Sequence, residues 1–272
     1  MTRQRRWHTT AIALVLTGIM LFLLYWMVNV SLTPRNELRK DPPNLFPMHA
    51  TFEGYPRVLH EQFPYLGTSL LVGLGTVAIT LALAAPAGFA LAKLRPIGGS
   101  VLNFLLLVAQ MIPGIIMAMG FYLILNNWGM LNTILGLIIA DTTLAVPFAV
   151  LIFTAFMMGL PNELIQAARI AGAGQWRTFR SIVLPMSRNS IVTVALFAFL
   201  WSWSDFLFAS TLNRGGSLQP VTIGIYRYLG NNTQDWIAIM ATAAVASVPA
   251  AILLVIAQRY VAAGVTAGAV KE

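Results

Sequence analysis

The sequence predicts an all-α fold, a polytopic bundle of six membrane-spanning helices. Of the 272 residues, 58% are hydrophobic and only 10% are charged, whereas an ordinary soluble domain has roughly 25% charged residues. Several stretches without Asp, Glu, Lys or Arg are also long enough to cross a bilayer, which takes about 20 mostly apolar residues. Soluble globular, disordered and fibrous classes are therefore excluded.

Uncharged stretches place the six spans along the chain. The first two lie near residues 10–30 and 68–91. Residues 96–140 carry no charge and are too many for one span, and Asn126-Asn127-Trp128-Gly129 is a turn pattern near their middle. They therefore divide into a third span near 101–125 and a fourth near 131–158. The fifth span lies near 189–211 and the sixth near 236–261.

The distribution of charge predicts the orientation. With both termini in the cytoplasm, the cytoplasmic segments hold most of the lysines and arginines and the external segments hold most of the acids, as the positive-inside rule requires. The first apolar run is longer than the roughly 7–15 residues of a secretory signal peptide, and no small-x-small cleavage site follows it. We therefore expect an uncleaved first span and an N-in, C-in topology.

These spans define three regions. Residues 1–66 hold the N-terminal cytoplasmic segment, the first span and a proline-rich external segment that we expect to fold as a cap of turns and short helices. Residues 67–262 form the core with spans two to six, including a cytoplasmic loop at 160–188. Residues 263–272 form a cytoplasmic C-terminal tail.

Several kinds of chemistry are absent from the sequence. There are no cysteines, so disulfides and Cys-ligated metals are excluded. The three lysines, Lys40, Lys93 and Lys271, do not follow the glycine pattern of an ATP-binding P-loop. The three histidines show no metal-ligand spacing. The net charge of +8 lies on the loops beside the spans, so we expect a lipid bilayer as partner and no nucleic acid, no metal and no cofactor on this chain.

The loop at 160–188 carries the most information. Leu164, Ala167, Ala168 and Ala171 share one face of a first short helix, with Glu163 in its first turn. Gly172 and Gly174 break that helix. A second short helix carries the apolar stripe Trp176, Phe179 and Val183 and ends at Pro185. The pattern fits a knob that docks into another protein, and it fits equally an amphipathic hairpin on lipid headgroups, with Arg177 and Arg180 beside the aromatic residues.

A family resemblance favours docking. Residues 166–173, followed by Phe179, Ile182 and Leu184-Pro185, resemble the EAA loop of ATP-binding-cassette (ABC) importer permeases. Further motifs resemble the six-span permease subunit of the carbohydrate-uptake, maltose-type family: Met111-Ile112-Pro113, Leu131-Asn132-Thr133, Pro147-Phe148, Trp203-Ser204-Asp205-Phe206-Leu207, Gln258-Arg259-Tyr260 and the tail from Gly264 to Lys271. Gln166 and Ala171 depart from the consensus, which has Glu and Asp there, and Arg188 replaces a common proline.

The resemblance implies a function and its partners. The chain would be a subunit with type I importer architecture in a bacterial or archaeal plasma membrane, and it would import a sugar by alternating access. Its partners would be a different second permease, two ATPases that bind ATP and Mg²⁺, and an external solute-binding protein. The residues implied in ATPase coupling are Glu163, Gln166, Ala167, Ala168, Arg169, Gly172, Ala173, Trp176 and Phe179, and those implied for the tail are Thr266, Gly268 and Lys271.

Polar and aromatic residues in or near the spans suggest substrate contacts. By residue type the candidates are Asn126, Asn127, Trp128, Trp201 and Trp203. Trp128 is better explained as an interfacial anchor, which leaves Asn126, Asn127, Trp203 and Asp205 as the predicted substrate or pore residues. For Asp141 we favour a structural role near Pro147. Arg214, Gly215 and Gly216 are the predicted contact with the binding protein, with an ordinary exposed loop as the alternative.

Two other functions were weighed against ABC import. An ion-coupled secondary carrier would be expected to show internal repeats and networks of charges within the membrane, and this sequence has only Asp141 and Asp205 inside predicted spans. A non-transporting assembly factor would use the loop at 160–188 only for docking. ABC import of a sugar is the prediction, with the secondary carrier as its alternative.

Overall fold

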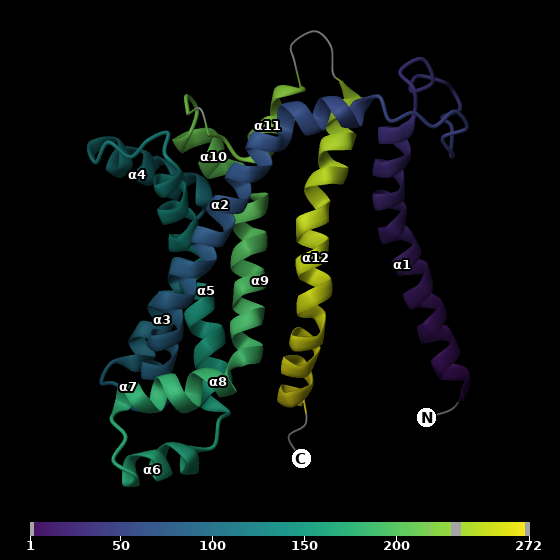
Figure 1. Ribbon diagram of the computed structural model, residues 1–272. Helices are drawn as coiled ribbons and strands as arrows, with labels where there is room; N and C mark the ends of the chain where they lie inside the picture. Colours follow the sequence, from purple (N-terminus) through teal and green to yellow (C-terminus); the bar gives the residue numbers. More distant parts are fainter. Residues whose placement is uncertain (1–2, 217, 230–234, 270–272) are drawn as a thin grey trace. The chain divides into compact units, whose positions relative to one another are not determined.

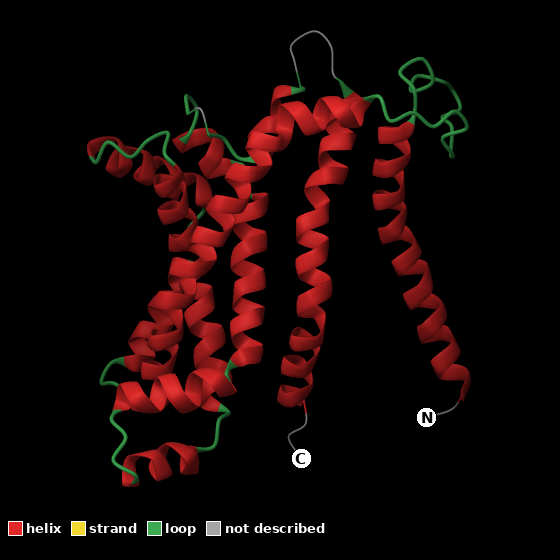
Figure 2. Ribbon diagram, viewed as in Figure 1, coloured by secondary structure: helices red, strands yellow, loops and turns green. Residues whose placement is uncertain are grey.

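The computed structural model describes residues 3–216, 218–229 and 235–269. Every regular element in these ranges is a helix (Figures 1 and 2). The chain forms two compact units, one from Met1–Pro64 and Gly224–Val248 and the other from Tyr65–Ile223 and Pro249–Glu272.

Within the described ranges, four helices are long and apolar enough to cross a membrane. They are Trp7–Leu32, Gly54–Leu94, Ile134–Met158 and Trp236–Tyr260. Two more spans result if each of two bent pairs counts as one: Gly99–Ala109 with Gly114–Asn127, bent by 97°, and Gln175–Met186 with Arg188–Ser204, bent by 78°. The membrane-helix fold class is confirmed, with four to six candidate spans.

The larger unit holds most of the helices. α2 (Gly54–Phe89) begins in the smaller unit and continues in the larger one, as does α12 (Trp236–Ala269), and α11 (Val221–Arg227) lies at the boundary. The other helices of the larger unit are η1 (Ala90–Leu94), α3 (Gly99–Ala109), α4 (Gly114–Asn127), α5 (Ile134–Met158), α6 (Asn162–Ile170), α7 (Gln175–Thr178), η2 (Phe179–Val183), α8 (Leu184–Met186), α9 (Arg188–Ser204) and α10 (Leu207–Leu212).

Small residues bring the central helices of the larger unit together. α5 and α9 lie side by side (Figure 1). A Cβ atom placed on Gly88 of α2 would lie only 2.5 Å from the Cβ of Phe153 on α5, so the two helices are in backbone contact there. Phe153 itself is completely buried. Close approach through glycine and alanine is how helices associate in a membrane, where no hydrophobic effect drives them together.

The predicted third span is not one straight helix. α3 ends at Ala109 and α4 begins at Gly114, at an angle of 97°. Pro113 explains the break, because proline has no N–H and the residue before it disfavours helical dihedral angles. Met111 N donates to Val108 O at 3.0 Å, so the end of α3 closes with a tighter turn.

The predicted fifth span also stops early, at Ser204. Asp205 is extended (ψ 124°) and accepts hydrogen bonds from Phe208 N at 3.2 Å and Ala209 N at 3.0 Å, so its carboxylate caps the separate helix α10. A short polar side chain that competes with the helix for backbone N–H groups accounts for this end.

Ion pairs join distant parts of the smaller unit. α1 (Arg3–Leu32) and the start of α2 belong to this unit, together with the start of α12. Asp235 accepts hydrogen bonds from Arg35 at 2.8 Å and from Arg57 at 3.0 Å, and Arg57 also pairs with Glu61 at 2.8 Å. Tyr228 donates to Glu61 at 2.8 Å. These contacts, with a buried cluster around Val58, hold the unit together.

The proline-rich segment between α1 and α2 is shorter than predicted. It ends at Gly54, where α2 begins, and Pro56 is tolerated there because the first helical turn needs no N–H donors. Within the segment, the Glu37 carboxylate binds Lys40 at 3.0 Å, Asn44 at 2.9 Å and His49 at 3.1 Å. The hydrogen bond from Lys40, with a further contribution from His49, holds the pKa of Glu37 below its usual value.

Candidate functional site

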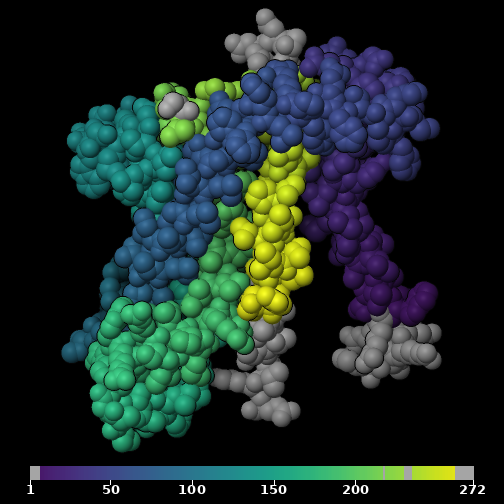
Figure 3. All heavy atoms as spheres, in the orientation of Figure 1, coloured from purple at the N-terminus to yellow at the C-terminus, as the bar shows by residue number. Residues whose placement is uncertain are grey.

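The loop at 160–188 lies at one end of the larger unit as two helical arms. The first arm is α6, and the second consists of α7, η2 and α8 in succession (Figure 1). Their atoms form a continuous surface at that end (Figure 3). Glu163 lies in the first turn of α6 and Arg169 in its last turn, so each charge stabilises its end of the helix dipole.

Gly172 makes the bend between the two arms. Its φ is +80°, a left-handed conformation that glycine adopts without steric cost. Ala173 N donates to Ala168 O at 2.9 Å and Gly172 N to Arg169 O at 3.0 Å. These two hydrogen bonds define a Schellman motif, which closes the end of α6 and fixes the direction of the chain. The predicted glycine bend is therefore present, and Gly172 rather than Gly174 carries it.

Of the four residues predicted to share one face of α6, only Ala168 points into the chain. Ile165 and Ala168, each 7% exposed, pack inward. Leu164 is 41% exposed, and Gln166, Ala167 and Ala171 are exposed as well. Most of the predicted small-residue face is therefore free for contact with another molecule.

The predicted aromatic stripe is divided between the interior and the surface. Phe179 is 5% exposed and its ring centroid lies 5.3 Å from that of Phe89 on α2, and Val183 is buried as well. Trp176 is 67% exposed, although its ring packs against that of Phe179 with centroids 5.4 Å apart. Ile170, at the tip of α6, is 89% exposed. The surface of the loop thus displays large apolar side chains, which mark interaction sites on proteins.

Lys93, on η1 directly after α2, fastens the first arm to the membrane helix Gly54–Leu94. Its ammonium group donates to Leu160 O at 2.6 Å and to Oδ1 of Asn162, the first residue of α6, at 2.8 Å. With the Phe89–Phe179 contact, the helix Gly54–Leu94 therefore holds both arms of the loop.

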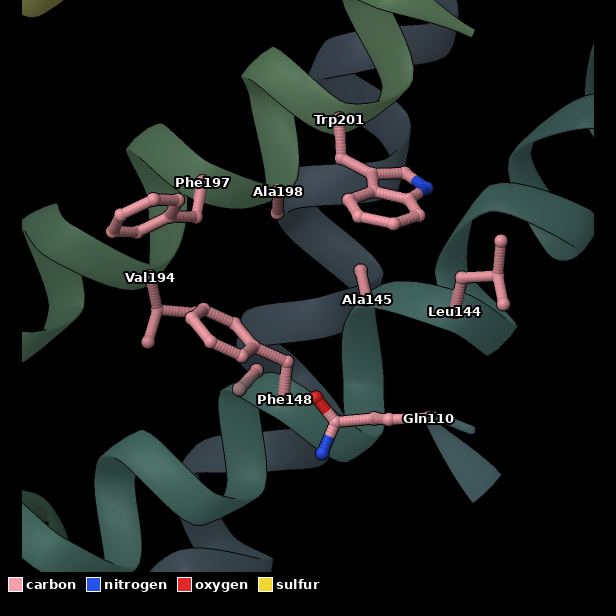
Figure 4. Close-up of a pocket in the computed structure, with 9 residues that line it drawn as sticks. Gln110, Leu144, Ala145, Phe148, Val194, Phe197, Ala198 and Trp201 are labelled. Atoms are coloured by element: carbon pink, nitrogen blue, oxygen red, sulfur yellow. The ribbon is translucent and has the colours of Figure 1, made fainter. Parts of the chain in front are cut away.

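A pocket of about 400 Å³ lies among α3, α5 and α9, at the break of the third span. Aromatic rings, aliphatic side chains and one amide form its wall (Figure 4). Phe148 and Phe197 meet edge to face with centroids 5.4 Å apart. Trp201 is 55% exposed, and Gln110 supplies the amide.

Comparisons with known proteins identify the family. Residues 84–267 match the model of the family described as binding-protein-dependent transport system inner membrane component. The chain belongs to this family. The matched residues include the whole loop at 160–188 and every residue that lines the pocket.

Relatives that match over nearly the whole length of this inner membrane component are named as permease proteins of uptake or transport systems. The chain is 28% identical to the diacetylchitobiose uptake system permease protein DasC of Streptomyces coelicolor, over 98% of this chain and 97% of the relative. It is 32% identical to the probable ABC transporter permease protein y4oR of Sinorhizobium fredii, over 99% and 96%. It is 28% identical to the trehalose transport system permease protein SugB of Mycobacterium tuberculosis, over the full length of both.

Solved structures share the fold of this inner membrane component. A chain of a bacterial ABC transporter involved in the import of the acidic polysaccharide alginate matches with a TM-score of 0.79 at 19% identity, over 96% of this chain and 99% of that one. A chain of the MetNI methionine ABC transporter, in an inward-facing conformation, matches with a TM-score of 0.58 at 17% identity, over 79% and 99%.

The predicted substrate residues of the inner membrane component are not gathered in one place. Asn126 and Asn127 are exposed in the last turn of α4. Trp203 is 7% exposed and stacks on Phe199 with centroids 5.2 Å apart. Asp205 caps α10. Trp201, two residues before Trp203 on α9, is the tryptophan that lines the pocket.

Asp141 has a different partner from the one expected. One of its carboxylate oxygens accepts a hydrogen bond from Ser202 Oγ at 2.5 Å, which ties α5 to α9. This hydrogen bond joins two helices and does not reach the backbone near Pro147. Thr143, in the same helix as Asp141, donates from its hydroxyl to Ile139 O at 2.8 Å.

The segment with Arg214, Gly215 and Gly216 is anchored on the turn before α5. Gly215 N donates to Asn132 Oδ1 at 2.9 Å, and Asn132 N donates to Leu212 O at 2.9 Å. Arg214 and Gly215 remain exposed. Asn132 has a φ of 61°, which asparagine tolerates better than most residues. The sequence could not reveal this anchoring, because it joins positions far apart in the chain.

The tail residues lie at the limit of the described structure. Thr266 and Gly268 fall in the last turns of α12, and Lys271 lies outside the described residues. The helix runs on through the region that we had separated as a tail.

Proposed function

We propose that this chain is one permease subunit of an ABC importer that brings a sugar into the cytoplasm, driven by ATP hydrolysis on separate subunits. The observation that carries the proposal is the full-length similarity to permeases named for diacetylchitobiose, trehalose and sulfoquinovosyl glycerol transport. The exposed apolar loop adds a surface on which a driving subunit can act.

The loop at 160–188 is the proposed contact with an ATPase subunit. Leu164, Ile170 and Trp176 would insert into a groove on that subunit, since exposed aliphatic and aromatic side chains act as anchors. Gln166 and Arg169 would contribute polar contacts around them. Because Phe179 is buried in the chain, only Trp176 of the aromatic pair is available to a partner. This arrangement favours docking over the alternative in which both aromatic side chains lie on lipid headgroups.

The same loop would transmit the motion. Movement of the loop would reach α2 through Lys93 and Phe89, and then α5 through the contact of Gly88 with Phe153. Alternating access would follow if these helices move together. A second, different permease, two ATPases and a solute-binding protein complete the proposed complex. The remaining proposed contacts are the tail around Thr266, Gly268 and Lys271 with the ATPases, and Arg214–Gly216 with the binding protein.

The proposal requires the loop to face the cytoplasm, with both termini inside. The chain has no cysteine, so a single introduced cysteine reports on its own position. In intact cells, a Met48→Cys variant should react with an impermeant thiol reagent, because Met48 is 79% exposed between α1 and α2. A Gly174→Cys variant should react only after permeabilisation. The opposite labelling pattern would contradict the orientation.

Reconstitution tests the function itself. The complete complex in proteoliposomes should take up a sugar only when ATP is inside with the ATPases and the binding protein is outside. Trehalose, maltose and diacetylchitobiose are suitable neutral probes, and the sugar-loaded binding protein should raise ATP hydrolysis above the unloaded level. Uptake without ATP, abolished by an ionophore, would show instead that the protein is an ion-coupled carrier.

A further inference from the structure

The pocket among α3, α5 and α9 stands beside an irregular piece of backbone. Residues 110–113 separate α3 from α4. α3 has 11 residues, which rise about 16 Å, roughly half of the approximately 30 Å hydrocarbon core. Lys93 and Arg95 precede α3 and mark where it enters the membrane. The break therefore lies at membrane depth.

Non-helical backbone at that depth needs a polar environment. It occurs only where it is buried in protein or lines a water-filled cavity. Gln110, the first residue after α3, is itself part of the pocket wall and is exposed. Among the residues that the structure describes, its Nε2 reaches only Leu106 O, at the long distance of 3.4 Å, so the amide is available for a solute. The break and the exposed amide together indicate that the pocket holds water and solute.

The rest of the wall is apolar, with three aromatic rings among aliphatic side chains. Phe148 comes from α5, and Phe197 and Trp201 come from α9, so two packed helices present three rings to the same space (Figure 4). The volume of about 400 Å³ falls within the range of small-molecule sites, about 300–1,000 Å³. None of the nine residues that line the pocket is charged.

We infer that this pocket is a subsite on this chain for one uncharged pyranose ring of the transported sugar, with the ring's apolar face on Trp201 and its hydroxyl groups toward Gln110. A pyranose has one C–H face and a rim of hydroxyl groups, so it needs an aromatic surface and a neutral hydrogen-bonding group together. A carboxylated or sulfonated ring finds no cation in this wall and is disfavoured, because an unpaired charge is costly to desolvate. The inference rests on the proposed function.

Uptake by the reconstituted complex tests the subsite. Trp201→Ala and Gln110→Leu should each lower uptake of trehalose, maltose or diacetylchitobiose, whichever the parent complex transports, by at least about tenfold. Trp201→Phe keeps an aromatic face and should retain most of the uptake. Trp128→Ala is the matched control, because Trp128 is 64% exposed at the end of α4 and does not line the pocket.

These outcomes separate the subsite from the proposed function. A parent complex that transports none of the three sugars contradicts the neutral-sugar inference, and if loaded binding protein also fails to stimulate its ATPase, the proposed function fails too. A parent that transports, with Trp201→Ala and Gln110→Leu behaving like Trp128→Ala, overturns the subsite alone. If Trp201→Ala instead reduces recovery of the second permease while the assembled complex transports normally, the pocket is a contact between permeases and the inference is wrong.

Chemical protection gives a reading that does not depend on transport. In a complex whose other subunits lack cysteine, Phe197→Cys should react with a methanethiosulfonate reagent, and a transported neutral disaccharide should slow that reaction. Digalacturonate, which carries carboxylates, should not slow it. Leu123→Cys, on α4 and away from the pocket, should react at the same rate with and without sugar. An unreactive Phe197→Cys, or equal protection by digalacturonate, contradicts an uncharged, water-accessible subsite.

Discussion

A Gly172→Val variant should reach the membrane and assemble with its partners but lose most of its sugar uptake. Gly172 has a φ of +80°, which costs a residue with a Cβ about 1–2 kcal/mol and a β-branched residue more. The Schellman motif that ends α6 would then open, and the exposed side chains of the two arms would lose their fixed arrangement. ATP hydrolysis would continue without being stimulated by loaded binding protein.

Asparagine at the same position provides the control. No atom outside the adjacent residues lies within 4 Å of a Cβ placed on Gly172, so the side chain itself meets no obstacle within the chain. Gly172→Asn adds a side chain of about the size of valine but tolerates the left-handed conformation, and it should keep most of the uptake. If the two variants lose uptake equally, bulk at the partner surface matters instead of backbone geometry. Normal coupling in Gly172→Val would refute the role of the bend.

A Gly88→Val variant should destabilise the membrane domain itself. A Cβ on Gly88 would lie 2.5 Å from Phe153 Cβ and 3.1 Å from Thr154 N, so α2 and α5 would have to separate. Overpacking of this kind typically costs about 1–3 kcal/mol or more, and here the obstacle includes backbone. We expect a clear loss of thermal stability in detergent, measured as a lower temperature for aggregation of the purified complex.

Gly67 on the same helix is the matched position. A Cβ there meets nothing within 4 Å, and Gly67→Val changes helix propensity just as Gly88→Val does. Its melting behaviour should remain close to that of the parent. Equal destabilisation by the two variants would show that intrinsic propensity, and not the contact with Phe153, is responsible.

The apolar stretches predicted the positions of the helices far better than the places where a helix breaks. Uncharged length is a local property of the sequence, and it located both ends of α5, the end of α1 and the start of α12 near their observed positions. Proline is ambiguous, however. Pro147 lies inside α5 and Pro249 inside α12, and both helices continue, whereas the third span breaks at Pro113. Neighbouring helices decide whether the freed backbone groups find partners, and the sequence does not contain that information.

In the candidate site, too, the sequence predicted local features but not those that depend on tertiary packing. The glycine bend followed from residue type, because few residues other than glycine adopt a positive φ. The predicted aromatic stripe followed from helical spacing, but spacing could not tell that Phe179 turns inward against Phe89 while Trp176 stays outside. The sequence does not place Gln110 beside Trp201, because these two residues line one pocket only through the tertiary packing around α5.

The ion pairs of Asp235 impose an order on biosynthesis. Arg35 and Asp235 are 200 residues apart, and the smaller unit lacks one side until Gly224–Val248 has been made. From Pro64 to Gly224 the ribosome must add 160 residues (224 − 64), which takes about 8–32 s at roughly 5–20 residues per second. During that time Arg35 and Arg57 lack their ion pairs with Asp235. The preceding helix α1 is apolar enough to remain in lipid alone. The part of the smaller unit that is made first is thus completed only near the end of synthesis, and a nascent chain stalled before Asp235 would lack both of these ion pairs.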